Sequence, residues 1–179
     1  MKRNIAMSHH TILKGTHRSI LSWFPRFHIN RKQISNTCTF YSDANYDFGD
    51  IDQLDINKLF GLSYGLHHNN SARFGWRWNI EKQMVEILAY VYVDGVRITE
   101  GAADLHIGYV HPGIQYDYTI KVVDGYYEFT LNSPLYPTPK VVKIKCSDRL
   151  TWWGYKLYPY FGGDKKAPHT VHVDLERIF

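Results

Sequence analysis

The first group of residues suited to chemistry lies between residues 66 and 78. His67 and His68 fall in a polar loop, and Arg73 and Arg77 follow it in a segment of alternating character. Alternation places both guanidinium groups on one face of a strand, where their forked donors match a carboxylate, sulfate or phosphate. The two imidazoles can accept or donate a proton near neutral pH. The competing interpretation is that both arginines pair with carboxylates on neighbouring strands, while the histidines belong to a polar turn.

The second group lies between residues 152 and 169. Counting by twos puts Lys156, Tyr158 and Tyr160, together with Trp152, on one side of a strand. Aromatic rings stack on the faces of sugars and a lysine among them can hold an anionic group, so this segment suits an acidic glycan. Core packing of a bulky hairpin explains the same pattern equally well. Pro159 predicts an edge strand or a bulge at this place.

Motifs of the common enzyme classes are missing from the chain. It has no G-x-S-x-G elbow, no P-loop, no G-x-G-x-x-G and no H-E-x-x-H sequence. Glu86 has no second carboxylate nearby with which to act as a glycosidase pair. Adjacent histidines such as His67 and His68 would point to opposite faces of a strand, which makes them a poor metal motif. We therefore assign no catalytic residues, no metal and no cofactor, and leave open whether the protein is an enzyme.

The composition indicates a single domain, expected over residues 1–179, that has neither nucleic-acid nor membrane partners. The chain carries 21 basic and 17 acidic residues, a net charge of +4 that is too mild for a nucleic-acid-binding surface. The longest apolar run, residues 87–93, is too short to cross a bilayer, and the amino terminus lacks a secretory pattern. We expect a cytoplasmic or virion location, and we expect Cys38 and Cys146 to be buried thiols.

Strands of alternating polarity, which would position both groups, fill the second half of the chain. Two hairpins that turn at Asp-Gly pairs are expected at residues 84–98 and 116–131. Three more strands are expected at residues 71–78, 141–146 and 171–176. Only residues 50–58 have the spacing of a helical turn, with Asp50 as its cap.

This succession of short strands predicts an all-β fold with little helix. We expect an antiparallel two-sheet β-sandwich, jelly-roll-like, with aliphatic stripes buried between the sheets. Aromatic residues make up 16% of the chain. We expect many of their rings to remain with the arginines on the outer faces, where one face would form a concave binding surface.

Four stretches of the sequence resemble a family of small, uncharacterised bacterial and phage-associated proteins. They are DINKLFG (55–61), HHNNSARFGWR (67–77), YVYVDGVRI (90–98) and YPYFGGDKKAPH (158–169). At the level of the fold, the pattern is similar to concanavalin-like jelly rolls, which include lectins, glucanases and polysaccharide lyases.

The resemblance to lyases of that kind implies roles for particular residues. Such lyases neutralise a uronate carboxylate with arginine and move protons with histidine or tyrosine. The residues that would fill these roles here are Arg73, Arg77, His67, Tyr158 and Lys156. The R-x-E-x-R, Q-I-H and Y-F-K-A-G-x-Y-x-Q patterns of the alginate-lyase family are absent.

The interpretation we favour is a non-catalytic protein that binds a carbohydrate-like or anionic partner through an aromatic and basic sheet face. The expected ligand-binding residues are Arg73, Arg77, His67, His68, Lys156, Tyr158 and Tyr160. One alternative is a structural or assembly protein with a protein partner, such as a phage particle component. The other is a polysaccharide lyase that acts on a polyuronate.

Overall fold

The computed structural model describes residues 7–23, 25–135 and 137–178, and strands dominate them. The strands are β1 (Met7–Ile12), β2 (Arg26–Ile29), β3 (Gln33–Phe40), β4 (Asn57–Ser63), β5 (Ser71–Asn79), β6 (Met84–Val93), β7 (Val96–Arg97), β8 (His106–Val110), β9 (Gln115–Val123), β10 (Tyr126–Asn132), β11 (Lys140–Lys145), β12 (Trp153–Leu157) and β13 (Val171–Arg177). The short 3-10 helices are η1 (Ile20–Trp23), η2 (Ser42–Ala44) and η3 (Ile51–Leu54). Within the described ranges, no helix has the length and apolar character needed to span a membrane.

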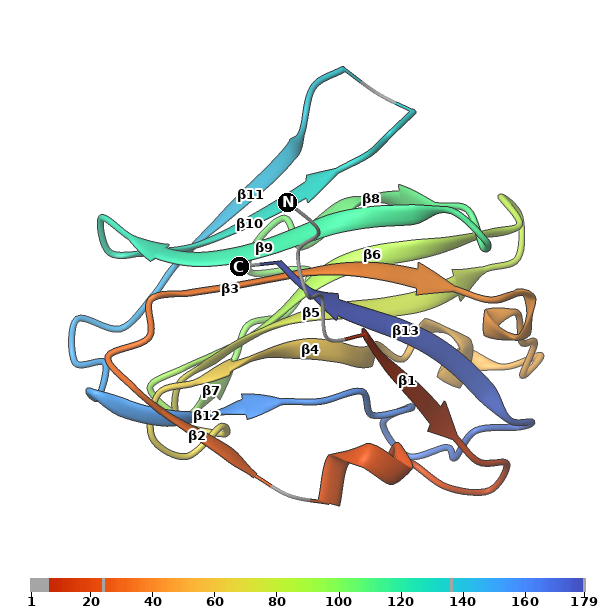
Figure 1. Ribbon diagram of the computed structural model, residues 1–179, viewed down its shortest axis with the longest axis horizontal. Coiled ribbons are helices and arrows are strands. Elements are labelled where there is room, and N and C mark those ends of the chain that lie inside the picture. The colour runs from red at the N-terminus through yellow and green to blue at the C-terminus, as the bar shows by residue number, and fades with distance from the viewer. Residues whose placement is uncertain (1–6, 24, 136, 179) are drawn as a thin grey trace.

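The strands form two antiparallel sheets packed face to face (Figure 1). The six-stranded sheet has the order β1-β13-β3-β9-β10-β11. The seven-stranded sheet has the order β2-β12-β4-β5-β6-β7, and β8 also pairs with β6. The predicted fold class, an antiparallel β-sandwich with little helix, is therefore confirmed.

The two predicted hairpins form where the Asp-Gly pairs stand. β6 turns into β7 at Asp94 and Gly95, and β9 turns into β10 at Asp124 and Gly125. All four residues have positive φ, between 48° and 85°, which is the conformation that a two-residue hairpin of matching twist requires. These turns fix the register of the strands that carry much of the outer surface.

The predicted helical turn is shorter than expected. η3 begins after Asp50, whose carboxylate accepts a hydrogen bond from the N–H of Asp52 at 3.0 Å. Lys58 belongs instead to β4, where it lies across from Gly75 of β5. The strand forms because its backbone groups pair with both neighbours, and this tertiary pairing outweighs a marginal helical pattern.

The edge strand or bulge predicted at Pro159 is not found. β12 ends at Leu157 and lies inside the sheet, between β2 and β4. Pairing with β4 resumes at Tyr160, whose N–H donates to the carbonyl of Lys58 at 2.9 Å. The proline, which has no N–H to donate, therefore interrupts the ladder without displacing the strand.

The aromatic side chains fill the core in larger numbers than expected. Phe74 of the seven-stranded sheet meets Tyr118 and Phe129 of the other sheet edge-to-face, with ring centroids 5.0 and 5.2 Å apart. Large rings bridge the space of about 10 Å between packed sheets better than aliphatic side chains do, which explains their inward placement. Cys38 and Cys146 are buried free thiols.

A bulge in β4 determines which side chains face outward. Lys58 lies across from Gly75, whereas Phe60 lies across from the core residue Phe74, so Leu59 is one residue extra. A bulge of this kind re-aims the side chain beside it. Lys58 consequently faces outward and Phe60 faces inward, although they stand two residues apart.

β4 and β5 approach each other closely at Gly61. A Cβ atom added there would lie 2.0 Å from the carbonyl oxygen of Ala72 and 2.7 Å from Cα of Arg73. Both atoms belong to the backbone and cannot move without shifting β5. Gly61 thus allows the two strands to form a continuous floor on the outer face of the sheet.

Replacing Gly61 with alanine is expected to destabilise the protein by about 2 kcal/mol, because the added methyl overlaps backbone. The measurement is the free energy of unfolding from urea titration. Gly101→Ala is the matched control, since its added Cβ meets nothing within 4 Å. Equal losses in the two variants would contradict the close approach.

Candidate functional site

A hollow of about 600 Å³ opens on the outer face of the seven-stranded sheet, and we call it the cationic pocket. Strands β4, β5, β6 and β12 and the loop that follows β4 contribute to its walls. None of its described lining residues is acidic. Its cationic residues are Arg18, Lys58, Arg73 and Lys156, and its tyrosines are Tyr90, Tyr92, Tyr155, Tyr158 and Tyr160.

Arg73 lines this pocket from β5. Its neighbours in β5, Ala72 and Phe74, are fully buried in the core, so alternation turns Arg73 outward, between Gly61 and Tyr90. Its Nε is shielded from solvent and has no hydrogen-bond partner among the described residues. Burial lowers the pKa of the Arg73 guanidinium to about 10, although nearby tyrosines oppose the shift. The group remains a cation at neutral pH.

Lys58 stands beside Arg73 and is held by backbone and aromatic contacts. Its Nζ donates to the carbonyl of Gly162 at 2.7 Å and lies 4.9 Å from the ring centroid of Tyr90. The Tyr160 ring centroid is 5.4 Å from the same Nζ. Burial, and then the charge of Arg73, lower the pKa of Lys58 to about 8. The ammonium group is therefore charged at neutral pH and loses its charge in mild alkali.

A histidine–tyrosine pair forms another wall. Nδ1 of His67 and the hydroxyl of Tyr155 are hydrogen-bonded at 2.6 Å. Burial, followed by the charge of Arg73, lowers the pKa of His67 to about 4, so its imidazole is neutral at pH 7. The hydroxyl of Ser71 donates to the carbonyl of His67 at 2.6 Å and fixes the loop. His68 packs its ring 4.2 Å from that of His67.

Six of the seven residues predicted to bind a ligand line the cationic pocket. They are His67, His68, Arg73, Lys156, Tyr158 and Tyr160. They come from two segments far apart in the chain, and the pairing of β12 with β4 brings these segments together. Whether these residues bind a ligand stays a prediction.

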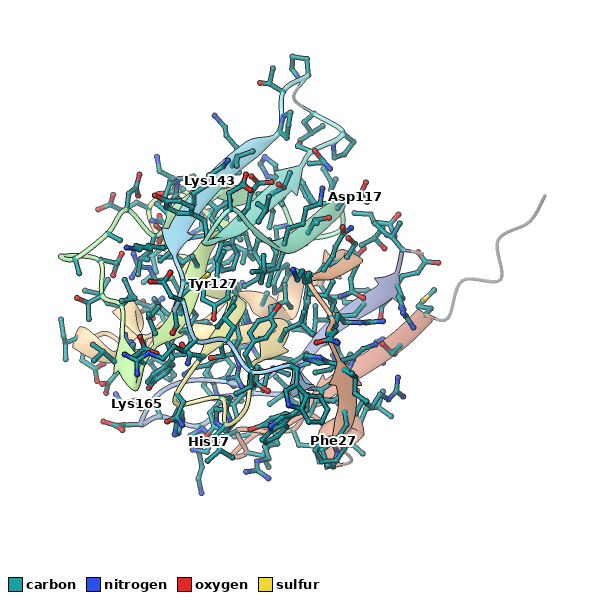
Figure 2. The ribbon with its side chains drawn as sticks, turned by 90° about the vertical axis from the view of Figure 1, so that its left-hand side faces the viewer. His17, Phe27, Asp117, Tyr127, Lys143 and Lys165 are labelled. Atoms are coloured by element: carbon teal, nitrogen blue, oxygen red, sulfur yellow. The ribbon has the colours of Figure 1, made fainter. Side chains whose placement is uncertain are left out.

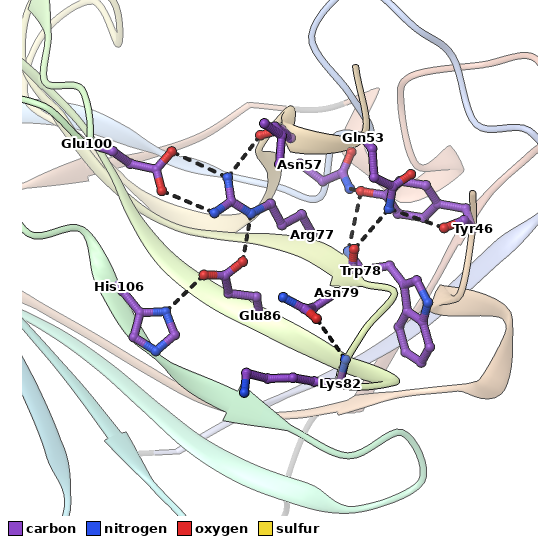
Figure 3. Close-up of polar contacts among 11 residues, drawn as sticks. Tyr46, Gln53, Asn57, Arg77, Trp78, Asn79, Lys82, Glu86, Glu100 and His106 are labelled. Carbon is purple, nitrogen blue, oxygen red and sulfur yellow. Dashed lines mark hydrogen bonds and ion pairs between the residues drawn. The ribbon is translucent and has the colours of Figure 1, made fainter. Parts of the chain in front are cut away.

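Arg77 is the exception, and its placement among the ligand-binding residues is not supported (Figure 3). Its Nε donates to Oε2 of Glu86 at 2.7 Å, and its Nη2 donates to Glu100 at 3.1 Å. The second oxygen of Glu86 is bonded to Nδ1 of His106 at 2.9 Å. The competing interpretation, an arginine paired with a carboxylate on a neighbouring strand, therefore holds for Arg77 through Glu86 of β6 but not for Arg73.

β12 and the segment after it border the pocket with residues from both sides of the strand. Leu157 lies across from Gly61, so Leu157 and Tyr155 share the face that carries the pocket. Lys156 and Tyr158 project from the other side of the strand and border the pocket from there. Tyr160 lies on the pocket face again, because it pairs with the outward-facing Lys58. The bulge in β4 and the break at Pro159 each interrupt the alternation of side chains at this place.

Lys58, Tyr90, Tyr92 and Tyr155 are among the pocket residues that sequence reasoning missed. Tyr90 and Tyr92 lie across from Arg73 and Ser71 in the β5–β6 pair, and alternation from the Asp-Gly turn could have located them. Tyr155 could be found only from the register of β12. Lys58 could not be recognised from the sequence, because it stands at the start of an apolar run and no sequence pattern indicates the bulge that turns it outward.

Comparison with known proteins supports the fold and leaves the function open. No protein-family model matches the chain, and no curated protein matches it either, so the resemblance to a phage-associated family finds no support. A functionally unknown protein from Saccharomyces cerevisiae is similar over 99% of this chain and 90% of its own, with a TM-score of 0.56 and 7% identity.

Two further similar structures carry functional names. One is an alginate lyase from Klebsiella pneumoniae, with a TM-score of 0.48 and 11% identity over 80% of this chain and 56% of that chain. The other is the CBM2 module of the Dit protein of Lactobacillus casei BL23 phage J-1, with a TM-score of 0.47 and 11% identity over 98% and 76% of the two chains.

The stability of the protein is expected to fall as pH decreases from about 6.5 toward 4. Burial lowers the pKa of His10 and of His67 to about 4, whereas both would titrate near 6.5 in the unfolded chain. The unfolded chain therefore binds more protons in this range, and acid favours it. Urea titrations across the range measure the slope. His10→Gln and His67→Gln should each reduce it, exposed His111→Gln should not, and an unchanged slope in the first two variants would contradict the burial effect.

Proposed function

We propose that the protein binds an acidic carbohydrate in the cationic pocket. The observation that carries this proposal is the Arg73 guanidinium, whose buried Nε has no partner among the described residues. A cation taken out of water costs several kcal/mol unless an anion or good hydrogen bonds compensate it. A ligand carboxylate or sulfate would provide that compensation through forked hydrogen bonds.

The size and walls of the pocket support a sugar rather than a small inorganic anion. A volume of about 600 Å³ lies within the range of pockets that hold drug-sized molecules. A single phosphate would leave most of that space and most of the tyrosine walls without contact. Tyrosine offers a ring for the apolar faces of a sugar and a hydroxyl for its polar edge. An acidic mono- or oligosaccharide uses both kinds of group.

The test is calorimetric titration with polygalacturonate, alginate and hyaluronan fragments, with neutral dextran fragments for comparison. Acidic fragments should bind, and Arg73→Ala should weaken binding by about 10- to 100-fold, the value of a charge-assisted pair. Arg149→Ala removes an exposed arginine outside the pocket and should change nothing. Affinity should also fall above about pH 8, where Lys58 and Lys156, with pKa values of about 8, lose their charge. Equal binding of neutral fragments, or full binding by Arg73→Ala, would contradict the proposal.

The His67–Tyr155 hydrogen bond favours a second candidate function, β-elimination of a polyuronate. Arg73 would neutralise the uronate carboxylate and make the C5 proton more acidic. Neutral His67 would accept that proton as the C4–C5 double bond forms and the C4–O bond breaks. The departing oxygen would receive a proton from Tyr155 or from water. The lyase roles that the family resemblance implied for Tyr158 and Lys156 pass in this scheme to Tyr155, which shares the face of Arg73.

Elimination is measured by the rise in ultraviolet absorbance of the unsaturated uronate product. If the protein is a lyase, Tyr155→Phe should reduce the initial rate by at least about 100-fold, a typical contribution of acid–base catalysis, while binding persists. A polyuronate that binds in the Arg73-dependent manner and gives no absorbance rise would exclude the lyase and retain the binding function.

A further inference from the structure

Exposed apolar side chains lie beside the cationic pocket. Phe27 and Ile29 of β2 are 70% and 69% exposed, and Leu66 in the loop after β4 is 62% exposed. Figure 2 shows Phe27 at the margin of the molecule, on β2. Single exposed apolar residues are ordinary on protein surfaces, but a contiguous group beside a polar pocket marks an interaction site.

Strand register makes these residues continuous with the pocket. Phe27 lies across from Tyr155 and Ile29 lies across from Trp153, so all four side chains share one face of the sheet. The Phe27 and Tyr155 rings meet edge-to-face, 6.2 Å apart, and Tyr155 is a wall of the pocket.

The loop after β4 adds Leu66 to this surface. Leu66 follows Gly65, whose N–H donates to the carbonyl of Trp153 at 2.8 Å, which places the loop beside the start of β12. We call the group formed by Phe27, Ile29, Leu66 and Trp153 the apolar shelf.

We propose that the acidic sugar bound in the cationic pocket carries an apolar aglycone, an alkyl or acyl chain, that lies on the apolar shelf. This inference rests on the proposed function, because the anionic group bound at Arg73 would fix the position of the aglycone over the shelf. Two of the four shelf residues, Ile29 and Leu66, are aliphatic, and a sugar ring would stack only on the aromatic rings of Phe27 and Trp153. A hydrocarbon chain packs against all four side chains, so the shelf suits hydrocarbon better than further sugar residues. The ligand class is therefore an amphiphilic acidic glycoside.

A second copy of the chain is a poorer occupant of the shelf. β2 has four residues, which offers few backbone hydrogen bonds to a pairing strand. Two copies joined at the shelf would also bring two cationic pockets close together in a protein of net charge +4. Like charges in such proximity oppose association, whereas an anionic amphiphile complements the pocket and the shelf at once.

The test compares methyl and octyl glycosides of glucuronic acid and of galacturonic acid, at concentrations below micelle formation, by chemical-shift titration. The octyl glycoside of at least one of these acids should bind at least about tenfold more tightly than its methyl counterpart, because burial of only two methylene groups supplies that factor. The double variant Phe27→Ser with Ile29→Ser should abolish the octyl advantage and leave methyl-glycoside binding unchanged. Leu135→Ser with Val141→Ser, two half-exposed apolar residues at the β10–β11 hairpin of the other sheet, is the matched control and should retain it.

Each contrary result identifies what has failed. Equal affinity for methyl and octyl glycosides would overturn the shelf and leave the acidic-sugar pocket intact. Equal binding of neutral octyl glucoside would overturn the joint recognition of anion and aglycone. Absence of binding by any acidic glycoside would overturn the proposed function together with this inference, and a dimer that the double variant dissociates would assign the shelf to a second copy.

Discussion

A guanidinium group held among tyrosines on the outside of a β-sheet is the interaction on which the site depends. Arg73 is placed there by its neighbours Ala72 and Phe74, which are locked in the core. Its Nε has no described partner, and burial lowers its pKa without removing its charge at neutral pH. The fold thus keeps a cation partly desolvated in advance of any ligand, and a preorganised group of this kind binds an anion with little further rearrangement.

Two irregularities of the backbone, the bulge in β4 and the break at Pro159, make this arrangement possible. The extra residue in β4 turns Lys58 outward, and the break at Pro159, after the end of β12, lets Tyr160 turn outward with it. Farther along β4, Gly61 allows β4 and β5 to approach each other closely. Bulges concentrate near functional sites because they change the aim of a side chain without disturbing the sheet. The aromatic core behind them provides a firm base for the pocket.

The sandwich and its hairpins could be predicted from the sequence because their causes are local. Asp-Gly turns require positive φ, and alternation separates the two faces of β6 without knowledge of its partners. Alternation does not reveal which face is inward when both carry large side chains, so the sequence predicts many rings on the outer faces, whereas rings such as Tyr118 and Phe129 lie in the core. The bulge at Leu59 depends on pairing between strands, and no local sequence pattern indicates it.

The site could be predicted only in part, because the partner of each arginine depends on the pairing between strands. Arg73 and Arg77 share one face and are indistinguishable by spacing, yet Arg77 lies across from Glu86 and Arg73 lies across from Tyr90. Only the register of β5 against β6 separates a paired arginine from an unpaired one. The role of the protein in an assembly, the other alternative from the sequence, stays a prediction.

The most direct measurement of the central claim is the NMR signal of each arginine Nε–H during titration with trigalacturonate. The account predicts a saturable shift of the Arg73 signal as the carboxylate arrives, and a constant Arg77 signal because Glu86 already accepts that hydrogen. A shift at Arg77 with none at Arg73, or saturating binding that moves neither signal, would contradict the assignment of Arg73 as the anion-binding group.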